Sequence, residues 1–383
     1  MRVLVVHNTY QQRGGEDTVV EAETALLQAH GHEVRLYGRH NDEIETQGRL
    51  RTAAQALWST RTTREMGDLL RQWQPEVVHS HNTFPLISPA LHWAARRAGI
   101  PVVQTLHNFR LLCVQGLMLR DERPCTRCVG HTPLAGVVHG CYRGSRAQSA
   151  VAAASLMLHR GLGTWSRCVD RFVALTPFCR DQMVAGGIDP ARIVVEPNFV
   201  DLPEPPVLAR SGLLFAGRLS HEKGVAVLSQ ALSALPAGSL RVAGSGPQRE
   251  LLEGQPACTM LGSLQPASLA HEMARAVALV LPSIWFEGFP RVLVEAYASG
   301  LPVIASRLGS LADLVEHEVT GLLVEPGHPA AWAQAMQWAL AHPQRMAEMG
   351  RAARIRYEAH YTPQRALARR LALYEAVLAS RAA

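Results

Sequence analysis

The sequence predicts an α/β protein made of two doubly wound parallel-sheet domains, and three observations support this prediction. Short β-branched runs alternate with longer segments of helical periodicity, and this alternation occurs twice along the chain. A proline-rich stretch separates the two series. The length of 383 residues also exceeds what one compact core accommodates, which favours two domains of ordinary size.

The first series predicts an N-terminal Rossmann-like domain over residues 1–200. Its first helix begins at Gly14-Gly15-Glu16-Asp17 and ends at His30-Gly31, because acidic residues favour a first helical turn and glycine commonly follows a last one. The predicted strands of this domain are residues 2–7, 33–37, 76–79, 101–106 and 171–175.

The second series predicts a C-terminal Rossmann-like domain over residues 201–364, after a linker in PNFVDLPEPPVLARSG at 197–212. Residues 365–383 have helical spacing and predict a terminal helix able to pack back on the N-terminal domain. Open sheets of this kind bind ligands at the carboxyl ends of their strands, so we expect a central cleft there. The predicted strands are residues 213–217, 239–244, 278–283, 301–306 and 321–326.

The composition is typical of a folded globular protein. Hydrophobic residues make up 48% and charged residues 18% of the chain, and no run of eighteen apolar residues predicts a membrane-spanning helix. The N-terminal MRVLVVHNTY is interpreted as a buried strand rather than a signal peptide. We therefore expect a cytoplasmic protein that can also bind peripherally at the inner face of the membrane.

The net charge of +6 lies mainly in the first half of the chain. Residues 1–200 contain 22 Arg against 17 acidic residues, a net of +5, whereas the remainder contains 16 basic against 15 acidic residues, a net of +1. The arginines are spread singly, without the aromatic-interleaved clusters of a nucleic-acid surface, so we expect no nucleic acid partner. An anionic membrane or anionic acceptor fits this charge, and an ordinary solvated surface is the alternative.

Two glutamates in FEGFPRVLVEAYASGLPVIA, residues 286–305, indicate a ligand with hydroxyls at two ends. Glu287 lies in a Gly-Phe-Pro loop, and Glu295 lies eight positions later in a predicted helix, about 12 Å away at helical rise. Carboxylates of hydrolytic pairs lie about 5 to 9.5 Å apart, so this pair does not fit a glycosidase. It fits an extended ligand with an anion at the helix N-terminus, such as a nucleoside diphosphate sugar.

The anion requires cations, which GRLSHEKG at 217–224 supplies. Lys223 is the only lysine in the chain, and a compact ammonium does not replace a planar guanidinium. Arg218 and Lys223 follow the strand at 213–217 and fall on the same predicted edge. The alternative for Lys223 is a local salt bridge with Glu222.

Together, GGEDTVVEAETALLQAHGHEV, GRLSHEKG, VAGSGP and PSIWFEGFPRVLVEAYASGLPVIA resemble the family 4 (GT4) retaining glycosyltransferases of the GT-B fold. The motifs run in order over most of the chain. The resemblance implies sugar transfer from a UDP- or GDP-sugar to a cell-envelope glycan or lipid-linked acceptor, with retained configuration and no cofactor required for catalysis. It places the chain in the synthesis of polysaccharide or lipopolysaccharide.

The resemblance also implies roles for individual residues. Glu287 contacts the donor sugar, Glu295 holds the ribose, Arg218 and Lys223 neutralise the diphosphate, and His107 lies beside the transferred sugar. As catalytic residues it implies Glu287, His107, Arg218 and Lys223. The donor-binding set that it implies is Gly14, Gly15, Arg218, Lys223, Gly244, Gly246, Gly288, Phe289, Pro290, Val292, Leu293 and Glu295.

The chain departs from the family pattern at two places. Pro290 stands where glycine is frequent, and proline removes a backbone donor that could meet a sugar hydroxyl. Asn198-Phe199-Val200-Asp201 replaces the usual Asn-Gly-Val-Asp after the linker strand. Arg291 follows Pro290 and either adds charge near the phosphates or faces solvent.

Four of the seven cysteines lie in one segment, as C-x11-C-x2-C-x12-C. In a cytosolic enzyme this spacing favours a structural zinc site formed by Cys113, Cys125, Cys128 and Cys141. His131 and His139 are substitute ligands, and free thiols or disulfides are the alternatives. The segment follows His107 and is predicted to form part of the acceptor side, in a subgroup of the family that carries this four-cysteine insertion.

Three other functions compete with the transferase. A GT-B-fold nucleotide-sugar epimerase or hydrolase would act without an acceptor, and a non-catalytic nucleotide-sugar-binding scaffold would keep its function after a Glu287→Ala substitution. A nicotinamide-dependent dehydrogenase is disfavoured because RGGED at 13–17 lacks the G-x-G-x-x-G turn.

Overall fold

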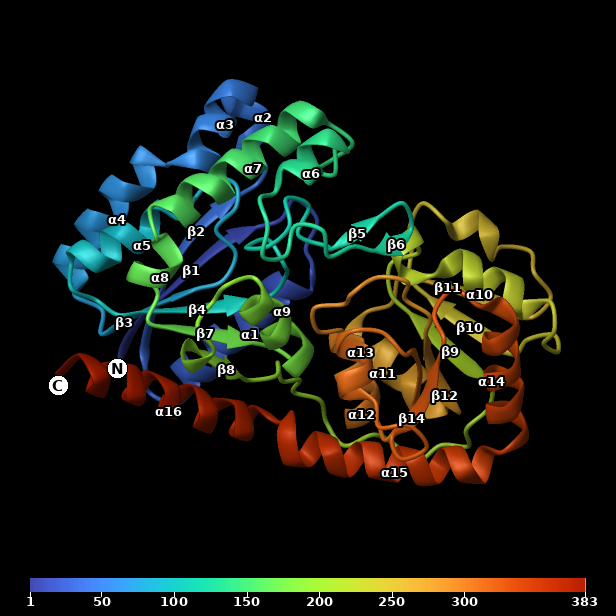
Figure 1. The fold of residues 1–383 in the computed structure, drawn as a ribbon. Helices are drawn as coiled ribbons and strands as arrows, with labels where there is room; N and C mark the ends of the chain where they lie inside the picture. Colours follow the sequence, from blue (N-terminus) through green and yellow to red (C-terminus); the bar gives the residue numbers. More distant parts are fainter. Residues whose placement is uncertain (383) are drawn as a thin grey trace. The chain divides into compact units, whose positions relative to one another are not determined.

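The computed structural model describes residues 1–382 and confirms the predicted α/β architecture, with two six-stranded parallel sheets (Figure 1). The chain forms two compact units. Unit 1 comprises Met1–Met118, Cys125–Pro197 and Ala366–Ala383, and unit 2 comprises Leu119–Pro124 and Asn198–Arg365. The short hairpin at 119–124, which the sequence places in the N-terminal domain, therefore belongs to unit 2.

Unit 1 is built on a sheet of order β2-β1-β3-β4-β7-β8. Helices α1 and α16 pack on one face through Val20, Leu27 and Tyr374, and α4 and α5 pack together on the other face (Figure 1). The elements of unit 1 are β1 (Arg2–Thr9), α1 (Gly15–Ala29), β2 (Glu33–His40), α2 (Glu43–Gln47), α3 (Arg49–Leu57), α4 (Thr60–Trp73), β3 (Val77–Ser80), α5 (Ala90–Arg97), β4 (Val102–Leu106), α6 (Leu134–Val138), α7 (Arg146–Gly161), α8 (Thr164–Cys168), β7 (Arg171–Ala174), α9 (Pro177–Ala185), β8 (Ile193–Val195) and α16 (Pro363–Ala382).

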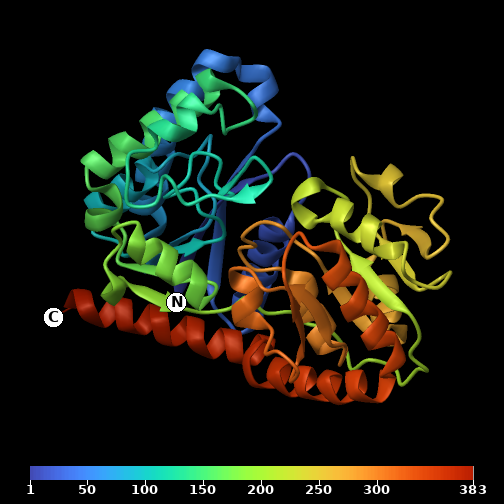
Figure 2. The ribbon, with the colours of Figure 1, turned by 45° about the vertical axis from the view of Figure 1, so that its right-hand side comes forward.

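Unit 2 is built on a sheet of order β11-β10-β9-β12-β13-β14. Helices α10 and α14 pack on one face around Trp332, and α11, α12 and α13 pack on the other around Tyr297 (Figure 2). The elements of unit 2 are β5 (Leu119–Arg120), β6 (Arg123–Pro124), β9 (Leu213–Ala216), α10 (Val225–Leu232), β10 (Leu240–Ala243), β11 (Cys258–Gly262), α11 (Pro266–Arg275), β12 (Ala278–Leu281), α12 (Arg291–Ala298), β13 (Val303–Ser306), α13 (Ser310–Leu314), β14 (Gly321–Val324), α14 (Pro329–Ala341) and α15 (Pro343–His360).

The predicted strands occur as such, and two further edge strands, β8 and β11, complete the sheets. Helix α1 begins at the predicted glycines, where Asp17 accepts a hydrogen bond from the backbone N–H of Gly14 at 2.7 Å. Residues 198–211 form no helix or strand, in line with the predicted linker. Among the described helices, none is both long and apolar enough to cross a bilayer.

Candidate active site

Three loops of unit 2 leave the sheet at the same edge. They follow β9, β10 and β12, and they contain GRLSHEKG, GSGP and PSIWFEGFP. Because β9 pairs in parallel with both β10 and β12, the carboxyl ends of these strands are neighbours. The strand order reverses between β9 and β12, which is where open α/β sheets bind ligands. The fold thus brings the two predicted donor motifs to one switch point.

Lys223 and Glu287 form an ion pair at this switch point. The ammonium of Lys223 donates to both carboxylate oxygens of Glu287, at 2.7 and 3.0 Å, and the hydroxyl of Ser283 donates to Glu287 Oε1 at 2.6 Å. Glu287 is 5% exposed, so the pair fixes a buried carboxylate in one orientation. The local alternative of a bridge between Lys223 and Glu222 is wrong, since Glu222 instead accepts a hydrogen bond from Ser220.

Arg218 supplies a second positive charge at the same edge. Its side chain is exposed, and among the described residues no carboxylate lies within ion-pair distance of it. Gly244 and Gly246 lie in the neighbouring loop with φ of 149° and 157°, and an added Cβ would overlap the carbonyl oxygens of Gly217 and Leu219. These two glycines therefore let the loops after β9 and β10 pack closely beside Arg218.

Helix α12 follows the Glu287 loop directly. Pro290 precedes its first residue, and Gly300 lies past its end with φ of 58°. Glu295 accepts a hydrogen bond from Arg291 at 3.3 Å, and both side chains are partly exposed. Arg291 thus lies beside the carboxylate predicted to hold the ribose.

Three residues of the predicted donor set serve packing. The Leu293 side chain is fully buried in the core of unit 2, and its backbone N–H donates to the carbonyl of Pro290. Val292 and Phe289 are partly buried against the same core, where the Phe289 ring lies 6.2 Å from that of Tyr361. These three residues can support a donor site only indirectly, by holding the loop that carries Glu287. Gly288 lies between Glu287 and Phe289 and is partly exposed.

In unit 1, His107 borders a cavity of about 70 Å³ at the carboxyl end of the sheet. His81 Nδ1 lies 2.9 Å from His107 Nε2, and burial lowers the pKa of both imidazoles, which favours their neutral forms. Polar side chains of Glu16 and Asn108, joined by a hydrogen bond of 2.9 Å, line the same cavity. The sequence analysis identified His107 but not His81. The position of His81 directly after β3, at the carboxyl end of a strand, could have marked it as a site residue.

The Gly14-Gly15 turn directly precedes Glu16, which lines this cavity, and it lies next to a buried contact between His7 and Asp17. His7 Nε2 lies 2.7 Å from the carboxylate of Asp17, which also caps the turn. An added Cβ at Gly15 would meet no atom within 4 Å. The fold of unit 1 therefore does not itself require glycine at position 15.

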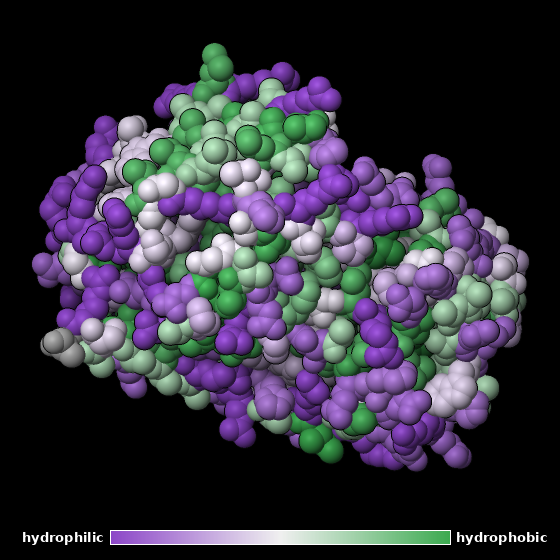
Figure 3. Space-filling model, in the orientation of Figure 1, coloured by the Kyte–Doolittle hydropathy of each residue, from purple (hydrophilic) through white to green (hydrophobic). Residues whose placement is uncertain are grey.

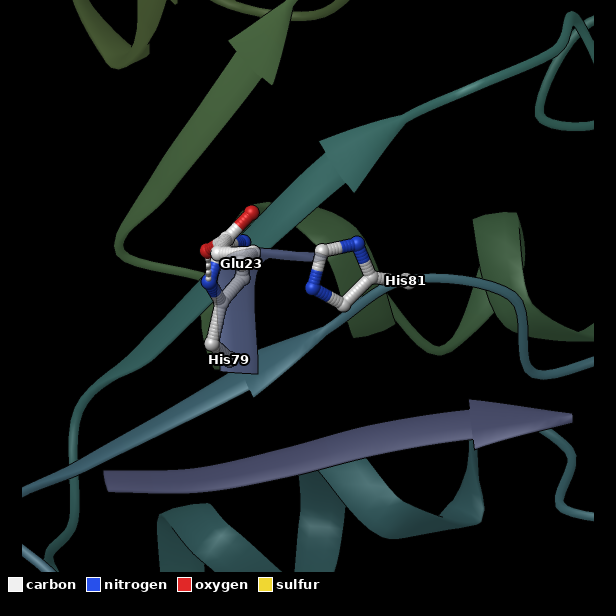
Figure 4. A group of neighbouring side chains, drawn as sticks. All are labelled: Glu23, His79 and His81. Carbon is white, nitrogen blue, oxygen red and sulfur yellow. Dashed lines mark ion pairs between the residues drawn. The ribbon is translucent and has the colours of Figure 1, made fainter. Parts of the chain in front are cut away.

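A buried charged network lies deeper in unit 1. Glu23, His79 and His81 are close neighbours (Figure 4), and the guanidinium of Arg370 on α16 contacts Glu23 at 2.8 Å and Glu196 at 3.2 Å. Burial opposes ionisation of Glu23, yet Arg370 and His79 outweigh it and lower its pKa to about 2. Because Arg370 already neutralises these carboxylates, we assign the group to fastening α16 rather than to a metal.

The four clustered cysteines lie in the loops around α6. Burial raises the pKa of the Cys128 thiol, and the nearby Cys113 and Cys125 raise it further, so these three are neighbours. Within the described residues, their sulfur atoms do not gather into a group that could share one metal ion. The zinc site stays a prediction, and it would require the sulfur atoms to move closer together.

Two parallel-sheet Rossmann-like units of this kind make up the GT-B fold of glycosyltransferases. Residues 13–204 match the family description "Glycosyltransferase Family 4", and residues 209–356 match "Glycosyl transferases group 1". The chain therefore belongs to glycosyltransferase family 4.

Relatives agree with this assignment, and solved structures agree with the fold. The chain is 29% identical over 304 residues to a glycogen synthase of Mycobacterium tuberculosis, which covers 75% of this chain and 65% of the relative. It therefore spans slightly less than two thirds of that relative's length. Sucrose-phosphate synthase from Thermosynechococcus elongatus has a TM-score of 0.72 at 20% identity, covering 99% of both chains. Anabaena HepE in complex with UDP has a TM-score of 0.69 at 17% identity, covering 98% of this chain and 100% of that one.

Proposed function

We propose that this enzyme transfers a sugar from a nucleoside diphosphate sugar to a cell-envelope glycan or glycolipid, with retained anomeric configuration. The observation that carries the proposal is the Lys223–Glu287 pair at the switch point of unit 2, with exposed Arg218 beside it. This arrangement offers positive charge for a diphosphate and an oriented carboxylate for sugar hydroxyls. The UDP bound to HepE, a structural neighbour, supports a donor of this class.

In this proposal the donor diphosphate takes over part of the contact that Lys223 makes with Glu287. Arg218 and Lys223 stabilise the negative charge that develops on the leaving nucleotide when the glycosidic bond breaks. Glu287, held by Ser283, then keeps an oxygen free for a hydroxyl of the sugar. Glu287 orients the sugar for attack from the same face and is not assigned as a nucleophile.

The acceptor is proposed to bind in the cavity beside His107. Its lining combines polar groups, among them Glu16 and Arg110, with apolar side chains such as Leu111 and Leu156. A neutral His107 can accept or donate a hydrogen bond to an acceptor hydroxyl, because burial lowers its pKa. The open position at Gly15 leaves room for backbone contact with either substrate.

Nucleotide release from UDP-, GDP- and ADP-sugars, measured with and without cell-envelope lipid extracts, tests the proposal. We expect one donor to be turned over faster when acceptor is present, and the product linkage to keep the donor's configuration by NMR. Glu287→Ala should abolish turnover while nucleotide binding persists. Turnover that is independent of acceptor would instead identify a hydrolase, and unchanged function of Glu287→Ala would identify a binding protein.

A further inference from the structure

The outer surface of unit 1 formed by α3, α6 and α7 combines exposed apolar side chains with arginines. Leu50 on α3 is 89% exposed, and Leu134 and Val138 on α6 are 53% and 63% exposed. Figure 3 shows hydrophobic surface over this part of unit 1, with hydrophilic atoms at its edge. We call it the α3/α6/α7 face, and its exposed residues are Arg49, Leu50, Arg51, Leu134, Val138, Arg143, Arg146, Ala147, Ala150, Ala154 and Leu158.

The three helices form one continuous structure. The Ser155 hydroxyl on α7 donates to the carbonyl of Ala56 on α3 at 2.7 Å, and His159 Nε2 lies 2.9 Å from the carbonyl of Leu57. The guanidinium of Arg146 donates to the carbonyl of Val138 at 3.1 Å, which joins α7 to the end of α6. The three helices are therefore tied to one another, and Arg143 lies in the turn between α6 and α7.

Helix α7 has a second apolar side that its own unit leaves uncovered. Its buried side packs through Ala152, Ala153 and Leu156, as a core helix does. Its opposite side carries Ala147, Ala150, Ala154 and Leu158, all exposed and spaced at three or four residues. A helix of an ordinary surface places charged residues there, so the uncovered side indicates a partner.

The charge on the three helices of this face has one sign, although Glu43 and Glu45 lie on the neighbouring helix α2. Residues 46–64 contain four arginines and no acidic residue, and residues 123–169 contain six arginines and no acidic residue. Among the described residues, Arg49, Arg51, Arg143 and Arg146 have no carboxylate within ion-pair distance. By contrast, exposed arginines elsewhere pair with glutamates on their own helices, as Arg249 does with Glu253 and Arg354 with Glu358.

We propose that the α3/α6/α7 face binds the surface of an anionic lipid bilayer. Apolar side chains of this size enter the boundary between headgroups and acyl chains, and arginines at the edge contact lipid phosphates. The uniform positive charge argues for this occupant over a second copy of the chain, because two such faces would repel one another. The inference goes beyond the proposed reaction and stands without it.

If the proposed function holds, the same face places the acceptor cavity near the membrane. Ala152, Ser155 and Leu156 on the inner side of α7 line the cavity beside His107, while the outer side of α7 belongs to the proposed membrane face. A lipid-linked acceptor would then have a short path from the bilayer to the cavity. This step rests on the proposed function, whereas the membrane contact does not.

Flotation of the full-length protein with lipid vesicles tests the inference without any substrate. We expect binding to vesicles of phosphatidylcholine mixed with phosphatidylglycerol, weak binding to phosphatidylcholine alone, and weaker binding as salt is raised. The double variant Leu134→Glu/Val138→Glu should bind at least about tenfold more weakly, and each of Arg143→Gln and Arg146→Gln about fivefold more weakly. The matched control is Ile355→Glu, a similarly exposed apolar position on α15 at 66%, which should bind as the wild type does.

A soluble assay separates the membrane face from the catalytic site. Leu50→Glu should weaken vesicle binding yet leave donor turnover with a detergent-dispersed acceptor unchanged. Equal binding to neutral and anionic vesicles, or wild-type binding by the Leu134→Glu/Val138→Glu variant, would overturn the inference. A wild-type dimer in solution that this variant converts to a monomer would also overturn it, because the face would then be a contact between copies of this chain.

Discussion

Replacing Lys223 by methionine tests whether its ammonium serves the donor as well as the fold. The substitution keeps most of the side-chain length but removes the two hydrogen bonds, at 2.7 and 3.0 Å, that Lys223 donates to Glu287. Glu287 keeps the hydroxyl of Ser283 at 2.6 Å as its remaining partner. The variant therefore leaves a nearly buried carboxylate without a counter-charge.

The burial of the Lys223–Glu287 pair determines how much stability the substitution should cost. Removing one partner of a fully buried ion pair costs about 3 to 5 kcal/mol. Lys223 is 26% exposed, so water partly replaces its contact with Glu287. We expect the free energy of unfolding to fall by about 1 to 3 kcal/mol. Nucleotide affinity should fall by about tenfold to a hundredfold, because a hydrogen bond to a charged diphosphate contributes about 1.5 to 3 kcal/mol.

The double variant Lys223→Met/Glu287→Gln distinguishes the two roles of Lys223. It removes the uncompensated charge, so denaturant unfolding should show most of the lost stability restored. Calorimetric titration with the preferred nucleoside diphosphate should still show the weakened affinity, because the cation is absent. The reasoning is refuted if the double variant regains wild-type affinity, or if Lys223→Met alone unfolds and binds nucleotide as the wild type does.

Three further predictions follow from other parts of the chain. Burial lowers the pKa of His92 to about 3, against 6.5 for a free imidazole, so the unfolded chain binds one more proton between these values. His92 alone should therefore add about 1.4 kcal/mol per pH unit to the rise of the free energy of unfolding across this window, and His92→Asn should reduce the overall slope in denaturant titrations. An unchanged slope in His92→Asn would contradict the assignment of this pH dependence to His92. Gly244→Ala should destabilise the protein by more than about 1 kcal/mol, because an added Cβ overlaps the carbonyl of Gly217, whereas Gly15→Ala should leave the unfolding midpoint unchanged while lowering turnover. Equal midpoints for Gly244→Ala and wild type would count against the loop packing. Metal analysis of purified protein should find one zinc ion per chain that Cys128→Ser loses, and a metal-free protein with reactive thiols would contradict the zinc prediction.

The sequence predicts ten strands of the two sheets, including the edge strands β2 and β14, but not the edge strands β8 and β11. An edge strand has only one neighbour, so burial selects its residues less strongly, and these two strands also lack a strong pattern of their own. Ile193–Val195 is only three residues long, and Cys258–Gly262 is half-buried without a β-branched run. Periodicity therefore carries little signal for them.

In the site, likewise, the residues that local sequence marks were predictable, whereas contacts between distant parts of the chain were not. The loops with Arg218, Lys223 and Glu287 are predictable because each follows a recognisable strand. The partner of Lys223 was not predictable, since the ion pair joins residues 64 positions apart through the pairing of β9 with β12. Arg370 lies even farther from His79, and only the docking of α16 on unit 1 brings the two together.

The central claim is that Arg218 and Lys223 hold the diphosphate of a nucleotide sugar at the switch point of unit 2. The direct test compares affinities for a nucleoside diphosphate and for its parent nucleoside, using whichever of UDP, GDP and ADP the wild type binds best. The wild type should strongly prefer the diphosphate, and Arg218→Met/Lys223→Met should bind both compounds with nearly equal affinity. A double variant that keeps the full preference for the diphosphate would contradict the claim.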